Sequence, residues 1–327
     1  MKIIILLCLI GLMISCGTQP NPLHEKVIVL DAGHGGTADI DEYRMGPAGE
    51  REEWVNLRVA EELEKLLSDA GATVIMTRTE DVQVELTDRA QLAIDNDADL
   101  FLSIHHNATA DSTVNFPITY YHGNASENLA GVKLATIINR QIRADLFDED
   151  TPYVTASDHT IFPQSGTGVL RNSYGIPGVI TELSFFTHPE EEQRLMERDY
   201  NREQAKSLLN ALKAYFSEDE LPIHDVYSTI EIPPFSVFQE EQRMSPEAKQ
   251  WRDYYENGKS IFESGNEKDF DRAYELASQS IKFFSDSYVA GDAHLLRAKI
   301  LEALGESDKA QKTRDRVREF YPNRVFY

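Results

Sequence analysis

The stretch Val-Ile-Val-Leu-Asp-Ala-Gly-His-Gly-Gly at residues 27–36 combines a strand signal with a ligand-site signal. Its first four residues are aliphatic and mostly β-branched, which predicts a short buried strand. His34 follows between glycines, which let the backbone turn sharply and leave the imidazole accessible. In α/β proteins, ligands bind at the carboxyl ends of parallel strands. The stretch therefore predicts the first strand of an α/β sheet with a ligand site at its end.

The residues that follow alternate between apolar strand-like runs and segments with helical spacing. The expected strands cover 27–30, 73–76, 100–104, 118–121 and 179–183, and the expected helices cover 53–70, 86–94, 127–144 and 190–216. Such alternation predicts an α/β fold with a mostly parallel sheet flanked by helices.

The last third of the chain has a different character. Residues 219–247 contain four prolines and several acidic residues, which is typical of a linker. Residues 248–327 predict a small all-α, repeat-like domain, and two weak copies of a pattern in it resemble tetratricopeptide repeats. A generic pair of helical hairpins is the alternative. Two copies are fewer than a free-standing solenoid needs, so we expect this domain to pack on the first domain or on a protein partner.

The first residues predict an export signal. Residues 1–15 contain Lys2 and an apolar run that is too short to span a membrane. The run ends at Cys16 in a segment that resembles the lipobox of bacterial lipoproteins, so we expect a lipidated Cys16 and a tether over residues 16–25. The alternative is an ordinary cleaved signal with a chance cysteine. Gly17 favours the outer membrane, facing the periplasm, in a cell with two membranes.

The acidic balance of the chain excludes two classes of function. With 32 Lys+Arg against 55 Asp+Glu in 327 residues, the net charge is −23. A nucleic-acid binder needs a basic face, and so does a protein that adsorbs to anionic lipid by charge. Both cysteines, Cys8 and Cys16, lie at the N-terminus, so the body of the protein has no disulfide, no thiolate metal site and no catalytic cysteine.

A second histidine follows another predicted strand, because residues 100–104 run directly into His105. Two histidines at the carboxyl ends of strands in one sheet indicate a metal site. Zinc accepts two imidazoles and one carboxylate and leaves a position open for water. Glu52 and Glu53, at the start of the first long helix, are the best-placed carboxylates. The competing carboxylates are Asp41, Glu42 and Glu50.

Glu182 is the best candidate for a general base. It lies inside the apolar run 177–186, where a carboxylate is costly to bury unless it is paired or functional. A metal-activated water needs such a base. An edge-strand or salt-bridged glutamate is the alternative.

An ordered set of motifs resembles one family over residues 26–216. The motifs are Val-Leu-Asp-Ala-Gly-His-Gly-Gly at 29–36, Gly-x-x-Glu-x-x-x-Asn-Leu at 49–57, Thr77-Arg78, Leu-x-x-Arg at 86–89, the run at 98–108, Tyr120-Tyr121, Val-Leu-Arg at 169–171 and Pro-x-Val-x-x-Glu-x-x-Phe at 177–185. Together they resemble the zinc-dependent N-acetylmuramoyl-L-alanine amidases of the amidase_3 type. The resemblance implies one zinc ion held by His34, Glu52 and His105, with Glu182 as the catalytic glutamate. The implied substrate is peptidoglycan, cut between N-acetylmuramic acid and the L-alanine of the stem peptide.

The sequence departs from this family at a few positions. Glu53 stands where the family often has lysine, and the register to Asn56 favours Glu52 as the ligand. His106 stands where the family commonly has a small residue. Three interpretations are open for it: support of the metal ligands, a place in the lining of the substrate groove, or an exposed ring with no role in the site. The substrate-binding candidates are Asn107, Arg171 and His106. We interpret 147–168 as a substrate-groove loop rather than a lid. Three further histidines are expected in loops or on the surface rather than as ligands: His122, His159 and His188.

These observations predict a lipid-anchored amidase of the cell envelope over residues 26–218, with an interaction domain at the C-terminus. Three alternatives remain at this stage. One is a zinc peptidase that acts on stem peptides, and another is a non-enzymatic envelope scaffold. The third is an amidase that stays inactive until a partner binds the helical repeats.

Overall fold

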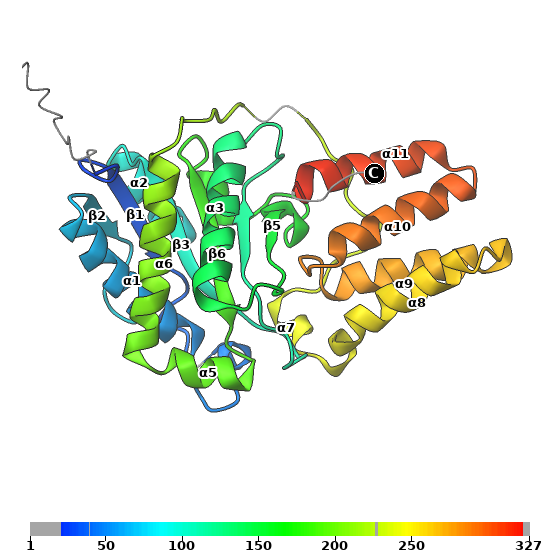
Figure 1. The fold of residues 1–327 in the computed structure, drawn as a ribbon, viewed down its shortest axis with the longest axis horizontal. Coiled ribbons are helices and arrows are strands. Elements are labelled where there is room, and N and C mark those ends of the chain that lie inside the picture. Colours follow the sequence, from blue (N-terminus) through cyan, green and yellow to red (C-terminus); the bar gives the residue numbers. More distant parts are fainter. Residues whose placement is uncertain (1–20, 39, 226–227, 323–327) are drawn as a thin grey trace, which may run out of the picture.

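A six-stranded sheet forms the centre of the first domain in the computed structural model, which describes residues 21–38, 40–225 and 228–322 (Figure 1). The strands are β1 Val27–Ala32, β2 Thr73–Met76, β3 Leu100–Asn107, β4 Ile118–Tyr121, β5 Val154–Ser157 and β6 Gly178–Phe185. Their order is β2-β1-β3-β6-β4-β5. All neighbours are parallel except β4 and β6. The predicted mostly parallel sheet is confirmed.

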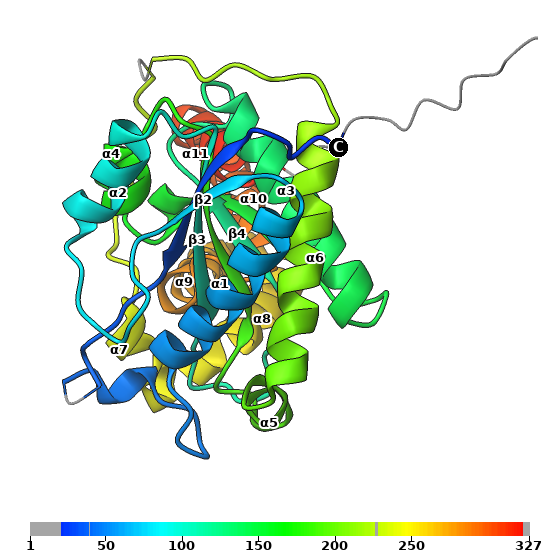
Figure 2. The same ribbon diagram turned by 90° about the vertical axis from the view of Figure 1, so that its left-hand side faces the viewer.

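Alternate residues of the strands feed two separate cores, as the period of a strand requires. On one face Ile28 and Leu30 join a core with three long helices. These helices are α1 Glu52–Asp69, α3 Leu129–Leu146 and α6 Arg198–Phe216. On the other face Val29 joins a core that includes α2 Leu86–Asp95 and α4 Gly168–Asn172. Figure 2 shows the two groups of helices on opposite sides of the sheet.

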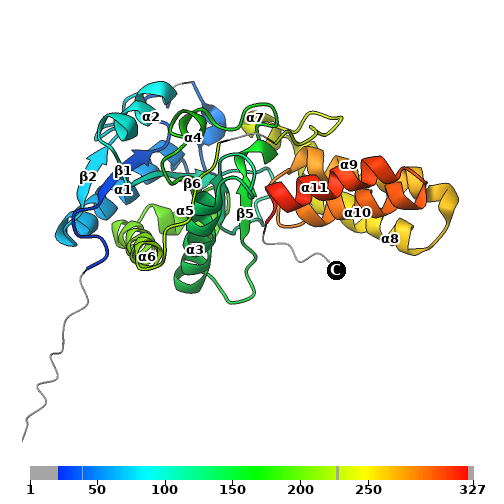
Figure 3. The same ribbon diagram turned by 90° about the horizontal axis from the view of Figure 1, so that it is seen from above.

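The predicted C-terminal helical region is present as two helical hairpins (Figures 1 and 3). Its helices are α8 Trp251–Glu263, α9 Phe270–Phe283, α10 Ala290–Ala303 and α11 Ser307–Phe320, and short 3₁₀ turns cover Pro246–Gln250 and Glu267–Asp269. Trp251 and Phe284 are buried in the same core as Val29 of the sheet. The helical region therefore packs on the first domain, which was one of the two expected arrangements. Its kinship with tetratricopeptide repeats stays a prediction.

The helix predicted over 190–216 and strand β5 differ most clearly from the sequence prediction. The predicted helix over 190–216 is two helices, α5 Pro189–Leu195 and α6, because the carbonyl of Leu195 is bound by side chains. Arg58 Nη2 and Asn201 Nδ2 each donate to that carbonyl oxygen at 2.9 Å, and these bonds end α5. Strand β5, inside the segment that we interpreted as a groove loop, was not predicted. It has only four residues, two of them polar, so its strand signal is weak.

Residues near the ends of the predicted domains contact the first domain, and the domain limits themselves stay a prediction. At the end of the expected tether, Leu23 is fully buried in the main core and Asn21 Nδ2 donates to the Ala70 carbonyl at 2.6 Å. In the described part of the predicted linker 219–247, the His224 backbone donates to the Glu127 carbonyl at 2.7 Å, and residues 240–243 form the short helix α7 Glu240–Arg243. The predicted signal and Cys16 lie outside the described residues.

No helix within the described residues has the length and apolar character needed to cross a membrane.

Candidate active site

The turn after β1 brings His34 close to the end of β3. His34 has a backbone φ of 59°, a left-handed conformation that is uncommon for residues with a side chain. A Cβ atom at Gly33 would lie 2.2 Å from the ring of His105, so only glycine fits there. The glycine that precedes His34 therefore lets the two histidines approach each other, and their ring centroids lie 4.6 Å apart.

Two buried arginines hold this turn through its carbonyl oxygens. Arg78 donates from Nε to the carbonyl of Ala32 at 2.8 Å and from Nη2 to that of Gly33 at 3.0 Å. Arg89 donates from Nη2 to the carbonyl of His34 at 2.6 Å. These bonds satisfy backbone acceptors that could not reach water inside the protein. The arginines of the Thr77-Arg78 and Leu-x-x-Arg motifs, Arg78 and Arg89, thus hold the His34 turn in place.

Asp31 balances the charge of this support. Its carboxylate accepts bonds from Arg89 and Thr77 at 2.7 Å and from Ser103 at 2.5 Å. Burial raises the pKa of Asp31, but the charge of Arg89 and the hydrogen bonds outweigh it, so that the pKa is lowered. The ionised carboxylate therefore anchors the arginine that holds the turn.

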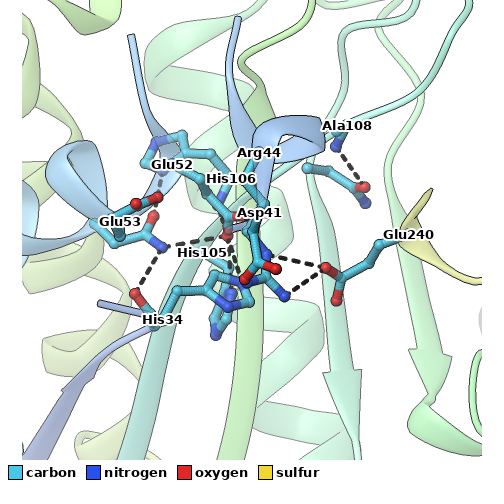
Figure 4. Close-up of polar contacts among 12 residues, drawn as sticks. His34, Asp41, Arg44, Glu52, Glu53, His105, His106, Ala108 and Glu240 are labelled. Atoms are coloured by element: carbon cyan, nitrogen blue, oxygen red, sulfur yellow. Dashed lines mark hydrogen bonds and ion pairs between the residues drawn. The ribbon is translucent and has the colours of Figure 1, made fainter. Parts of the chain in front are cut away.

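Glu52, the first residue of α1, contacts both histidines and completes a cluster of three side chains (Figure 4). Its Oε1 lies 3.1 Å from His34 Nε2 and 3.0 Å from His105 Nδ1. Burial raises the pKa of Glu52, but the two imidazoles outweigh it and hold the pKa well below its usual value. One ligand atom from each residue lies within 4.8 Å of the others. Two imidazoles and a carboxylate are a donor set that suits zinc.

The competing carboxylates point elsewhere. Glu53 is fully buried, and its Oε1 accepts a bond from Arg51 Nε at 2.7 Å. Glu50 is paired with Arg58 at 3.0 Å. Asp41 is paired with Arg44, which also contacts Glu240. The structure thus brings Glu52, and not Glu53, beside the two histidines.

Glu182 lies beside the cluster on β6, where it is paired in register with His105 of β3. Within the described part of the chain, its Oε2 is buried without a hydrogen-bond partner. Burial first, and then the charge of Glu52, raise the pKa of Glu182 well above its usual value. A cavity of about 610 Å³ is lined by Glu182 together with His34, Glu52 and His105. A half-buried carboxylate with one buried, unpaired oxygen in such a cavity is suited to proton transfer.

All three substrate-binding candidates line the same cavity, and two of them, Asn107 and Arg171, have donor groups available there. Asn107 accepts a bond from the Ala108 backbone at 2.8 Å, while its Nδ2 is buried without a partner. Arg171 is exposed on α4, and its Nη1 donates to the Ser165 carbonyl at 3.1 Å. Both side chains present donors to a molecule in the cavity.

His106, the third candidate, uses both ring nitrogens inside the protein. Nδ1 lies 2.8 Å from Asn56 Oδ1, and Nε2 lies 3.0 Å from Gln204 Nε2. Burial lowers the pKa of His106 to about 3. These partners assign a neutral ring that donates to Asn56 and accepts from Gln204. Asn56 in turn donates to Glu52 Oε1 at 3.2 Å, so His106 supports the cluster instead of contacting substrate through its ring.

The remaining predicted histidines are not part of this cluster. His188 caps α5, and its Nδ1 accepts from the Glu191 backbone at 3.3 Å. His122 is buried, not on the surface, and lies 2.9 Å from Asp158 Oδ2. His122, Asp158 and His159 form a second group that could hold a metal by distance. Since Asp158 also accepts two bonds from Thr167, it fastens the loop that forms part of the cavity wall.

Sequence reasoning missed the contribution of residues 238–243 to this cavity. Phe238, Gln239, Glu240 and Arg243 line it, although they belong to the predicted linker. Glu240 Oε2 accepts from Arg44 Nη2 at 2.8 Å, across from Glu52 (Figure 4). No local signal in the linker could have shown this, because the contact depends on how the helical region packs on the sheet.

The fold and the cluster together define an α/β protein with a candidate metallohydrolase centre. A family model described as N-acetylmuramoyl-L-alanine amidase matches residues 28–214, more than half of the chain. The chain belongs to this family.

Individual relatives agree with this assignment. The probable cell wall amidase LytH of Staphylococcus epidermidis is 32% identical over 203 residues, which is 60% of this chain and 60% of that relative. This chain thus spans about 60% of the length of the curated relatives it matches. The N-acetylmuramoyl-L-alanine amidase of Clostridium difficile 630 is 26% identical, with a TM-score of 0.51 over 60% of this chain and 100% of that chain. AmiC2 of Nostoc punctiforme is 26% identical, with a TM-score of 0.50 over 59% and 98%.

We expect Gly33→Ala to weaken zinc binding by about 10- to 100-fold, because the new methyl group displaces the ring of His105. The measurement is a titration of the full chain with Zn²⁺ against a competing chelator. Gly178→Ala is the matched control, since its Cβ would have its nearest contacts at 3.5 Å. Wild-type affinity in Gly33→Ala would contradict the close approach of the two histidines.

We expect His106 to make the fold sensitive to acid. Its pKa is about 3 in the folded protein and about 6.5 when unfolded, so the unfolded state binds more protons between these values. Stability therefore falls as the pH drops below about 6.5, and this one residue costs about 2 kcal/mol at pH 5.

The measurement is urea unfolding of the metal-free protein at pH 5 and pH 7.5. In His106→Gln the loss of stability between the two pH values shrinks by about 2 kcal/mol. The exposed His24→Gln serves as the control and keeps the wild-type loss. An unchanged loss in His106→Gln would show that the ring is not held neutral by burial.

Proposed function

We propose that this protein is a peptidoglycan amidase that hydrolyses the bond between N-acetylmuramic acid and the L-alanine of the stem peptide. The observation that carries the proposal is the unpaired carboxylate of Glu182 beside the His34–Glu52–His105 cluster, in one cavity of a family-matched domain. The substrate and the bond come from the family and from relatives described as cell wall amidases.

We further propose that the cluster holds one zinc ion. The support is the donor set itself, with His34 Nε2 and His105 Nδ1 both directed at the same oxygen of Glu52. When bound, a zinc ion supplies the Lewis acidity that activates water and stabilises negative charge on a carbonyl oxygen.

The side chains of this site divide the remaining tasks. Glu182 takes a proton from the attacking water at Oε2 and later delivers it to the leaving amine, a role that suits a carboxyl group whose pKa is raised. Asn107 Nδ2 and Arg171 provide hydrogen-bond donors for the substrate. His106 and Asn56 keep Glu52 oriented toward the two histidines.

The setting of the enzyme is part of the proposal. Relatives described as cell wall amidases support a place in the cell envelope, and the lipobox-like segment supports an acyl anchor at Cys16. A zinc peptidase would use the same side chains and differs only in the bond that it cuts. A scaffold without activity is less well supported, because the cluster and Glu182 are all present.

The decisive test is a digest of purified peptidoglycan with the full chain, with and without a chelator. We expect free stem peptides and peptide-free glycans, identified by mass, and no release of either when the chelator is present. Cleavage within the peptides would identify a peptidase. Release that persists in chelator would exclude the metal-dependent mechanism.

We expect Glu182→Gln to bind zinc normally and to lose turnover by about 10²- to 10⁴-fold, because the amide cannot accept a proton. Metal content and the rate of release of stem peptides are measured on the same preparation. Glu62→Gln, a change of the same kind outside the cavity lining, where α1 packs against α6 and Glu62 pairs with Arg202, is the control. Near-normal activity in Glu182→Gln would remove this residue from the mechanism.

A further inference from the structure

The segment just before the helical region contributes to the candidate catalytic cavity, although the family match ends at residue 214. Residues 238–243 form part of the cavity wall. Helix α7 within them is fixed to the first domain, since the Ala110 backbone donates to the carbonyl of Arg243 at 2.9 Å. The side chain of Arg243 is buried and lines the cavity together with Glu182.

Two residues of the helical region hold the guanidinium of Arg243. Its Nη1 lies 3.2 Å from Asp286 Oδ1, and its central carbon lies 4.4 Å from the ring centroid of Phe284. Asp286 is fully buried and also accepts a hydrogen bond from the hydroxyl of Tyr120 on β4. One end and one face of the guanidinium are therefore fixed by the fold.

The other edge of the guanidinium has no acceptor. Among the described residues, neither Nε nor Nη2 of Arg243 has a hydrogen-bond partner, and both are buried. Buried donors without acceptors are costly and rare in native proteins. These two N–H groups point the same way and form the fork that binds both oxygens of a carboxylate. A single water molecule offers only one oxygen to this fork.

We propose that Arg243 is a binding subsite for a carboxylate of the stem peptide, presented by the C-terminal region at the catalytic cavity. This inference rests on the proposed amidase function. The stem peptide is the leaving fragment of that reaction, and its carboxylates are on the same side of the cut as the leaving amine. Glu182, which serves that amine, lines the same cavity as Arg243. Asp286 is then a positioning residue that acts through Arg243.

The test compares two synthetic muramoyl peptides, one with free carboxylates and one with every carboxylate converted to a carboxamide. Binding is measured by calorimetry with the full chain, and turnover is measured separately. We expect the wild type to prefer the free carboxylates by about tenfold or more in Kd and in kcat/KM, with most of the difference in KM.

Arg243→Met alone would leave Asp286 buried and unpaired, so the principal variant is the double substitution Arg243→Met with Asp286→Asn. We expect this variant to bind zinc normally and to lose the preference for free carboxylates both in Kd and in kcat/KM. Arg243→Lys restores charge but not the fork, and we expect it to recover only part of the preference. Arg314→Met, an exposed arginine paired with Glu302 on the far helices, keeps the full preference.

A double variant that retains the wild-type preference would overturn the inference, and so would a wild type that binds both compounds equally. Either result leaves the amidase function intact if the compounds are still cleaved. Conversely, a wild type that prefers the free carboxylates in binding but cleaves neither compound would support the subsite and contradict the proposed function.

Discussion

A histidine with left-handed backbone geometry in a buried turn requires donors for every carbonyl of that turn. Arg78 and Arg89 provide them, and Asp31 balances the charge that they bring. An unpaired carbonyl at this depth would cost about as much as a lost hydrogen bond, so neither arginine is replaceable by an apolar residue. Because the turn is fixed, His34 and His105 meet at the ends of neighbouring strands, and a single carboxylate of α1 can reach both. The remaining features of the site depend on this turn.

The sequence indicates the sheet well, because its central strands are continuous apolar runs covered on both faces. The two histidines that the structure brings together at the cavity, His34 and His105, follow predicted strands. What local patterns could not show are short or interrupted elements. Strand β5 has too few apolar residues, and the break before α6 depends on side-chain bonds from Arg58 and Asn201 to one carbonyl. The role of His106 could not be predicted from local sequence either. Its partner Gln204 belongs to a helix almost a hundred residues away in the chain.

The region outside the family match is joined to the site by polar contacts as well as by apolar packing. Trp251 and Phe284 continue the core of one sheet face, while Asp286 reaches Tyr120 and Arg243. The helices that the sequence indicates as a separate interaction domain thus share a core with the first domain. They reach the cavity wall only indirectly, because Asp286 contacts Arg243. Anything that shifts these helices would also shift Arg243.

The buried position of Leu23 also sets how far the enzyme can travel from a membrane. Asn21, where the described chain begins, is only five residues beyond Cys16, a length of at most about 18 Å when fully extended. The chain enters at the amino end of β1, and the candidate site residues His34 and His105 lie toward the carboxyl ends of β1 and β3. With the proposed acyl anchor at Cys16, the segment between the lipid and the folded domain would be short. The cavity would then lie at the end of the sheet that is farther from the lipid. Such an enzyme would trim only the layer of wall nearest to its own membrane, at a height set by the length of one sheet.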